Sequence, residues 1–220
     1  MANLNHSILP VTSSDLPTLA NFLHSSKLRL SINRLLFKHW PNEATQKPLY
    51  SNAVESGFKN TSAESLKVID DESRDIIGYL VLTRKRPVNT EQQPTDKENG
   101  ERKQTIPDGL NPDVLSAISN AVAKVEKEIE GIDHLELTYI YVKPSSRNHG
   151  IGSQLVQMCF DKAKAEGVPL TLSSEPEAHD FFVKRGFEDT RHVDIDLILR
   201  ASLEALLGPI AVTNADELGL

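Results

Sequence analysis

The stretch that decides the fold runs from Val142 to Ser153 and reads VKPSSRNHGIGS. A segment typical of a strand, Leu135 to Val142, precedes it, and a segment typical of a helix, Gly152 to Glu166, follows it. Between them lies a short loop with a basic residue and two glycines one residue apart. Such a loop can direct several backbone N–H groups at one anion, at the positive end of the helix. The stretch therefore predicts a binding site for a phosphate or a pyrophosphate.

Side chains of a strand alternate between its two faces, which divides the predicted strand into two sets. One face is expected to carry Glu136, Thr138, Ile140 and Val142, and the other Leu135, Leu137, Tyr139 and Tyr141. The helix that follows is amphipathic and must pack on the sheet. Its apolar row is expected to hold Ile151, Leu155, Cys159 and Ala163, with Val156 and Phe160 beside it.

The rest of the chain alternates between segments typical of strands and of helices. Thr12, with Asp15 three positions on, resembles a capping box, and Asn111 followed by Pro112 indicates another helix start. Two apolar runs separated by residues 70–75 predict a hairpin. The expected strands are 8–11, 66–69, 76–83, 135–142, 170–173 and 193–199. The expected helices cover 26–40, 152–166 and 177–185, and two more begin at 12 and at 111. Residues 42–62 are ambiguous and fit a short helix and a loop. This order predicts an α/β or α+β fold with a mixed sheet.

The 220 residues are enough for one sizeable domain, and we expect a single domain over 1–220. Residues 84–108 hold prolines and a glycine among charged and amide residues, with almost no apolar content. We therefore expect a flexible surface insertion over about 84–110 rather than a domain boundary. Residues 201–220 show no clear pattern and are left unassigned.

The composition, 39% hydrophobic and 25% charged residues, is typical of a soluble globular protein. The net charge of −7 argues against nucleic acid as a partner, and no apolar stretch approaches the ~20 residues of a membrane span. The single cysteine, Cys159, excludes an internal disulfide, and residues 1–14 lack the pattern of a signal peptide. The histidines have no metal-ligand spacing, so no metal is expected. We expect a cytoplasmic protein, with the nucleus as the open alternative and the oligomeric state unknown.

The stretch and the segment after it resemble the acetyl-CoA-binding core of the GNAT superfamily of acyl-CoA N-acyltransferases. The family's pattern Gln/Arg-x-x-Gly-x-Gly/Ala is matched by RNHGIG, Arg147 to Gly152. Members commonly show an aromatic pair and then Gly-Phe, and this chain reads FFVKRGF from Phe181 to Phe187. The resemblance covers about residues 135–187. It implies a mixed, mostly antiparallel central sheet that is flanked by helices and splayed at the cofactor-binding strand.

The resemblance further implies that the cosubstrate is acetyl-CoA, with its pyrophosphate over Arg147 to Gly152 on backbone amides. Glycine lets the backbone approach the anion without a Cβ in the way. The pantetheine arm would pair with the backbone of the strand, as an added strand would. The implied cofactor-binding residues are Ile140, Tyr141, Val142, Arg147, Asn148, His149, Gly150, Ile151, Gly152, Ser153 and Phe182.

The implied reaction is transfer of the acetyl group to a primary amine, either of a small molecule or of a lysine or an N-terminus. The amine attacks the acetyl carbonyl directly in a ternary complex, and a strand amide can stabilise the oxyanion. A general base must take a proton from the ammonium, often through water. Several members carry an acidic residue eleven positions before the Gln/Arg of the loop. Glu136 stands there and is the candidate base.

The chain departs from the family at Phe182, where many members have a tyrosine that protonates the leaving thiolate. Three explanations stay open. First, the thiolate can leave unassisted, because its thiol has a pKa of about 8.5. Second, another hydroxyl can donate the proton, from Tyr139 or Tyr141, although both are expected on the opposite strand face. Third, the protein binds acyl-CoA without efficient turnover. The last explanation is the alternative function, a non-catalytic acyl-CoA-binding or regulatory module. Glu175 stands where asparagine is common, which argues against a part in cofactor binding.

Overall fold

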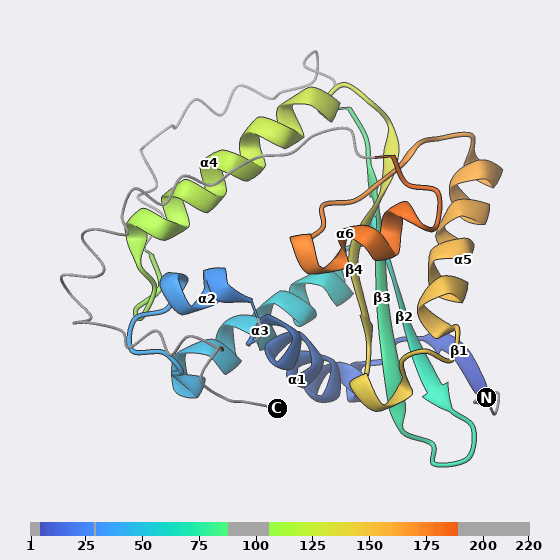
Figure 1. Cartoon of the computed structure of the whole chain (residues 1–220), viewed down its shortest axis with the longest axis horizontal. Coiled ribbons are helices and arrows are strands. Elements are labelled where there is room, and N and C mark those ends of the chain that lie inside the picture. Colours follow the sequence, from blue (N-terminus) through green and yellow to red (C-terminus); the bar gives the residue numbers. More distant parts are fainter. Residues whose placement is uncertain (1–4, 29, 88–105, 189–220) are drawn as a thin grey trace, which may run out of the picture.

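The computed structural model describes residues 5–28, 30–87 and 106–188. Within this part five strands form one sheet in the order β1-β2-β3-β4-β5 (Figure 1). The first four strands pair antiparallel and β5 pairs parallel to β4. The strands are β1 (His6–Pro10), β2 (Ala63–Asp70), β3 (Ile76–Lys85), β4 (His134–Val142) and β5 (Leu170–Thr171). The predicted mixed, mostly antiparallel sheet is confirmed, and so is the hairpin, which β2 and β3 form.

Helices lie on both faces of the sheet, and each face has its own hydrophobic cluster. The helices are α1 (Leu16–Lys27), α2 (Ser31–Leu36), α3 (Glu43–Lys59), α4 (Pro112–Ile129), α5 (Ile151–Glu166) and α6 (Pro176–Val183). On one face Leu155 of α5 packs with Leu80 of β3, and on the other Leu19 of α1 packs with Val81. Each such fully buried side chain stabilises the fold by roughly 1.5–3 kcal/mol. The helix α4 packs against α2, at a distance from the sheet (Figure 1).

A β-bulge at Thr138 changes which side chains of β4 share a face. Tyr139 pairs with Val81 and Leu137 pairs with Leu82, so Thr138 has no opposite residue in β3. Because the extra residue shifts the alternation, the expected division of the strand is wrong beyond this point. Leu135, Leu137, Ile140 and Val142 face α5, whereas Glu136, Tyr139 and Tyr141 face the side of α1 and α3.

The helical segments before β2 also differ from expectation. Instead of one helix over 26–40, α1 continues to Lys27 and α2 covers only Ser31–Leu36, because Phe37 adopts an extended conformation and bridges Leu110. The ambiguous region forms the 17-residue helix α3, with Pro48 inside it. A proline within a helix lacks one N–H donor, so Pro48 argues against a long helix at this point of the sequence. Packing against the rest of the fold nevertheless holds α3 in place.

The other elements lie close to their expected positions. Asn111 caps α4 by accepting a hydrogen bond from the N–H of Asp113 at 3.1 Å, and α5 and α6 begin within one residue of prediction. β5 is shorter than expected, with only Leu170 and Thr171 paired. The expected strand 193–199, the tail 201–220 and most of the expected insertion, residues 88–105, lie outside the described residues. The single-domain organisation stays a prediction.

Candidate functional site

The loop between β4 and α5 has the backbone that an anion site requires. After the 3-10 turn η3 (Pro144–Ser146), Asn148 and Gly150 both have a left-handed backbone, with φ of 63° and 83°. Gly150 caps α5, and a Cβ added to it would meet nothing within 4 Å. The first N–H groups of a helix have no acceptor within it, so those of α5 are available beside this open space.

Two arginines hold positive charge at the loop. Arg147 donates from Nε to the carbonyl of Val142 at 3.0 Å, and its guanidinium lies 5.9 Å from the ring centre of Tyr141. Arg185, which follows α6, donates to Ser153 Oγ from Nε at 3.0 Å and from Nη2 at 2.7 Å. Ser153 Oγ accepts both bonds and still has one proton of its own to donate. Arg185 was not predicted from the sequence, since only the fold brings it to the start of α5.

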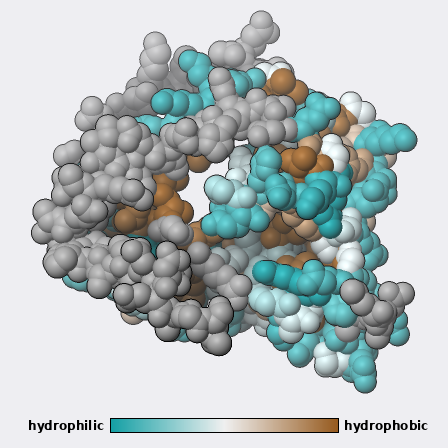
Figure 2. All heavy atoms as spheres, viewed as in Figure 1, coloured by the Kyte–Doolittle hydropathy of each residue, from teal (hydrophilic) through white to brown (hydrophobic). Residues whose placement is uncertain are grey.

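A cleft of about 1060 Å³ runs from this loop along the edge of β4. Among the described strands, β5 pairs with β4 only at Leu135 and Glu136, which leaves the later part of that edge of β4 open. The cleft is lined by every predicted cofactor-binding residue except His149. On the face shown in Figure 2, apolar residues are visible between hydrophilic ones. A groove that combines an open strand edge with an anion loop can hold a long ligand with a charged end.

Glu136, the candidate base, lies next to the cleft rather than in its wall. Its carboxylate is on the α1 and α3 side of β4, and Oε2 is 3.2 Å from the Nζ of Lys85. The side chain is 26% exposed, so water reaches it. The following residues, Leu137 and Thr138, line the cleft, but Glu136 does not. A proton would therefore reach Glu136 from the cleft through water.

Tyr139 places a hydroxyl in the cleft wall, next to the position of Glu136. Its O–H is 3.0 Å from the Oγ of Ser26 on α1, which in turn donates to the carbonyl of Leu23. Burial strongly raises the pKa of the Tyr139 hydroxyl, so this group keeps its proton at neutral pH. Phe182 also lines the cleft and packs edge-on against Phe181 and Phe187. The bulge therefore brings a hydroxyl to the cleft that regular alternation places on the other face.

An ion pair joins the two sides of the cleft. Lys27, in the last turn of α1, lies with its Nζ 2.9 Å from Oε1 of Glu175, the residue before α6. Both residues line the cleft. Their side chains are 33% and 43% exposed, so the pair is open to solvent.

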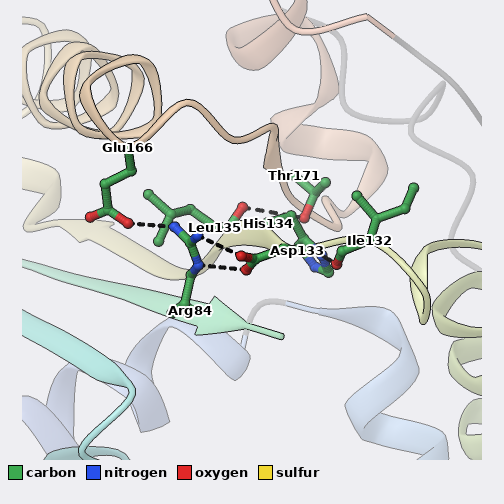
Figure 3. A network of polar contacts seen from close by, with 7 residues as sticks. All are labelled: Arg84, Ile132, Asp133, His134, Leu135, Glu166 and Thr171. Carbon is green, nitrogen blue, oxygen red and sulfur yellow. Dashed lines mark hydrogen bonds and ion pairs between the residues drawn. The ribbon is translucent and has the colours of Figure 1, made fainter. Parts of the chain in front are cut away.

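A network of polar contacts lies at the start of β4, where it begins to pair with β5 (Figure 3). Arg84 at the end of β3 donates to both carboxylate oxygens of Asp133, at 2.6 and 2.7 Å, and pairs with Glu166 of α5. These hydrogen bonds hold the pKa of Asp133 below its usual value. His134 is buried and its Nδ1 is 2.7 Å from the carbonyl of Ile132, which gives it a structural place.

Other reactive groups are remote from this chemistry. Burial raises the pKa of the Cys159 thiol to about 12, so it is a thiol inside the core at neutral pH. Over the described ranges, no three histidine, cysteine or acidic side chains lie close enough to hold a metal ion. Across the same part of the chain, none of the helices has the length and apolar character that crossing a membrane requires.

Comparisons with known proteins agree with the geometry. Residues 116–189 match a family model described as acetyltransferase (GNAT) domain, and no curated protein matches the chain. One similar solved structure is described as histone acetyltransferase HPA2 and related acetyltransferase, from Corynebacterium glutamicum ATCC 13032, with 16% identity, 87% of this chain and 89% of that chain covered, and a TM-score of 0.55.

Two further structures cover 86% of this chain. A transcriptional regulator from Bacillus halodurans C-125 has 20% identity, 97% of its own chain covered and a TM-score of 0.52. An aminoglycoside N-acetyltransferase in complex with CoA has 14% identity, 92% of its own chain covered and a TM-score of 0.50. At these identities the likeness is one of fold, and it extends over the segments before residue 116 that the family model does not match.

Proposed function

We propose that this chain, whose residues 116–189 match the GNAT acetyltransferase domain, transfers an acetyl group from acetyl-CoA to a primary amine in a ternary complex. The observation that carries the proposal is the cleft, which follows the open edge of β4 to a left-handed glycine at the start of α5. An extended amide-bearing arm can pair with an open strand edge, and a pyrophosphate fits the N–H groups of a helix start. The arm and the pyrophosphate of coenzyme A meet both requirements at once.

The residues around the loop fit the charge of coenzyme A. The open space at Gly150 leaves room for a phosphate group against the backbone. Arg147 and Arg185 would offset the negative charge of the pyrophosphate, and Ser153 would donate its hydroxyl proton. The side chain of His149 does not line the cleft, so we assign only its backbone to this site.

The reaction requires one bond to form and one to break. The neutral amine nitrogen attacks the acetyl carbon, a C–N bond forms, and the C–S bond breaks to release the coenzyme A thiolate. The nitrogen loses one proton, which we assign to Glu136 through water, and the thiolate gains one, which we assign to Tyr139. Tyr139 is assigned this part because it lines the cleft and its hydroxyl carries a proton at neutral pH. A backbone N–H of β4 would stabilise the oxyanion.

A thiol-release assay tests the proposal. The full chain is incubated with acetyl-CoA and a panel of primary amines, and free coenzyme A is measured together with the acetylated product. Release that depends on the amine supports the transferase. Tight binding of acetyl-CoA with no release of coenzyme A across the panel would instead support the non-catalytic module. Phe182 favours this alternative, because its side chain has no proton to donate to the thiolate.

Replacing Glu136 by glutamine is expected to lower kcat about a hundredfold, because general bases contribute roughly 10²–10⁴-fold and this one acts through water. The dissociation constant of coenzyme A, measured by calorimetry, should stay unchanged because Glu136 does not line the cleft. Lys85→Met is the matched control, since it removes the ion-pair partner and keeps the carboxylate. A kcat within threefold of the parent protein would remove Glu136 from this part.

Replacing Tyr139 by phenylalanine is expected to lower kcat about tenfold. The effect is modest because a thiolate is a fair leaving group near neutral pH. Tyr79→Phe is the matched control, since its ring centre lies 5.3 Å from that of Tyr139 but Tyr79 does not line the cleft. Steady-state kinetics that gave equal losses for the two variants would indicate a packing effect and not a proton donor.

A further inference from the structure

We propose that Glu175 binds a second, protonated amino group of the acceptor, and that Lys27 occupies this position when no acceptor is bound. The substrate class is then an amine that carries two amino groups, one neutral and reactive and one charged. The inference rests on the proposed transferase function and names the acceptor for the same cleft.

The position of the ion pair supports this inference. The helices α1 and α6 lie on opposite sides of β4, and Lys27 and Glu175 meet across the cleft with 2.9 Å between Nζ and Oε1. They meet on the side of β4 that β5 leaves open. An acceptor that approaches β4 along this open edge passes between these two side chains, so it must displace one of them or bind to one of them.

The exposure of the pair allows such an exchange. With a third or more of each side chain open to solvent, the two charges are screened by water, and ion pairs of this kind contribute little net stability. An ammonium group of a ligand can therefore replace the Lys27 ammonium at Glu175 with the same charge and the same hydrogen bonds. The Lys27 side chain is long and flexible, so it can turn towards water when displaced.

The charges of the cleft favour a cation at this end. Lys143, Arg147 and Arg185 line the end with the anion loop. Among the described residues, the other end is lined by two carboxylates, Glu175 and Glu177, and by one cation, Lys27. With Lys27 displaced, the described residues that line this end have two negative charges and no positive one. A ligand with an additional ammonium group would restore the balance, whereas a ligand carboxylate would be repelled.

The hydroxyl groups between the two ends complete the site. Tyr139 and Ser26 line the cleft beside Lys27, and the carbonyl of Lys27 accepts a hydrogen bond from Asn33 at 2.9 Å, which holds the end of α1 in place. A diamine with one nitrogen at Glu175 would place its second nitrogen towards these hydroxyls and β4, where the acetyl group is proposed to lie.

The test compares a primary monoamine with the α,ω-diamine of the same carbon chain. We expect the full chain to acetylate the diamine with a kcat/KM at least tenfold higher, since hydrogen bonds to charged groups are worth roughly 1.5–3 kcal/mol. Glu175→Gln should remove most of this preference by raising KM for the diamine. Lys27→Met should lower that KM, because no side chain competes for Glu175. The two substitutions thus shift the same constant in opposite directions.

Binding gives a second measurement that does not need turnover. Calorimetry with the diamine and coenzyme A should show the same opposite shifts in the dissociation constant of the diamine. Glu64→Gln is the matched control, because it removes a carboxylate from another exposed ion pair, with Lys162, and should not change the preference.

Three results would overturn the inference: equal kcat/KM for the two amines, equal shifts from the two substitutions, or a preference for amines with a carboxylate that Lys27→Met abolishes. Failure of the transferase function has a different signature, which is diamine binding that depends on Glu175 without release of coenzyme A.

Discussion

Replacing Gly150 by glutamate is expected to weaken the binding of coenzyme A roughly a thousandfold. Gly150 has φ of 83°, a left-handed backbone that costs other residues about 1–2 kcal/mol. The space around its Cβ position is open, so the new carboxylate would project into the proposed pyrophosphate site. Two like charges about 4 Å apart repel by ~4 kcal/mol at an effective dielectric constant of 20. Calorimetric titration with coenzyme A measures the effect.

Two control variants separate charge from strain. Gly150→Gln has the same shape without the charge and should lose much less affinity. Gly167→Glu introduces the same side chain at the other end of α5, where the glycine is also left-handed with φ of 66° and open space around it. That variant should bind coenzyme A normally. Normal binding by Gly150→Glu would contradict the assignment of the pyrophosphate to this loop.

Replacing Asp15 by alanine is expected to lower the free energy of unfolding by about 3–5 kcal/mol, the usual effect of breaking a buried ion pair. The Asp15 carboxylate accepts a hydrogen bond from Lys67 at 2.6 Å and another from the N–H of Thr12 at 2.7 Å. Both side chains of the pair are about nine-tenths buried. Alanine would leave the Lys67 charge buried without a partner. Urea unfolding measures the loss.

The same pair predicts how stability depends on pH. Burial is the largest single influence and raises the pKa of Asp15, but the hydrogen bonds from Lys67 and Thr12 and the charge of Lys67 together outweigh it and bring the pKa below its ordinary value of 3.8. A lowered pKa in the folded state stabilises the fold fully above the pKa of the unfolded chain. This contribution is lost as the pH falls through the lower, folded-state pKa.

The urea midpoint of the parent protein should therefore decline in acid more steeply than that of Asp15→Asn. Glu55→Ala, which breaks an exposed pair with Lys59, is the control and should leave the midpoint nearly unchanged. The double variant Asp15→Leu with Lys67→Met should recover much of the loss, because it leaves no buried charge. A midpoint for Asp15→Ala equal to that of the control would contradict the prediction.

The part of the fold that follows β4 could be predicted because its signals are local. Gly150 and Gly167 stand at the two ends of α5, where each has the left-handed backbone that favours glycine. The helices before β2 were harder to predict, because α3 has Pro48 in its interior and Gly57 near its end. Their position is fixed by packing, as with Leu19 of α1 against Val81 of β3. A window of sequence does not contain such contacts.

Some residues of the site could likewise be predicted from local sequence, and others could not. The loop residues follow from the glycine spacing, whereas Arg185 and the Lys27–Glu175 pair come together only through the fold, the pair across 148 positions of sequence. The pattern of apolar and polar residues in β4 does not indicate the bulge at Thr138, which reverses the expected faces of Ile140 and Tyr139. The place of Glu136 next to the cleft is likewise set by the sheet register and not by its distance from the loop in sequence.

The edge of β4 that the other described strands leave open has a consequence for the behaviour of the protein in solution. An exposed row of unpaired strand amides is a template on which another chain can add a strand, so such edges favour aggregation unless charged groups guard them. Lys27 and Glu175 lie across this edge, and coenzyme A would cover the rest. We expect the protein without the proposed cosubstrate to be the more aggregation-prone form, and the Lys27–Glu175 pair, which we propose selects the acceptor, to protect the edge as well.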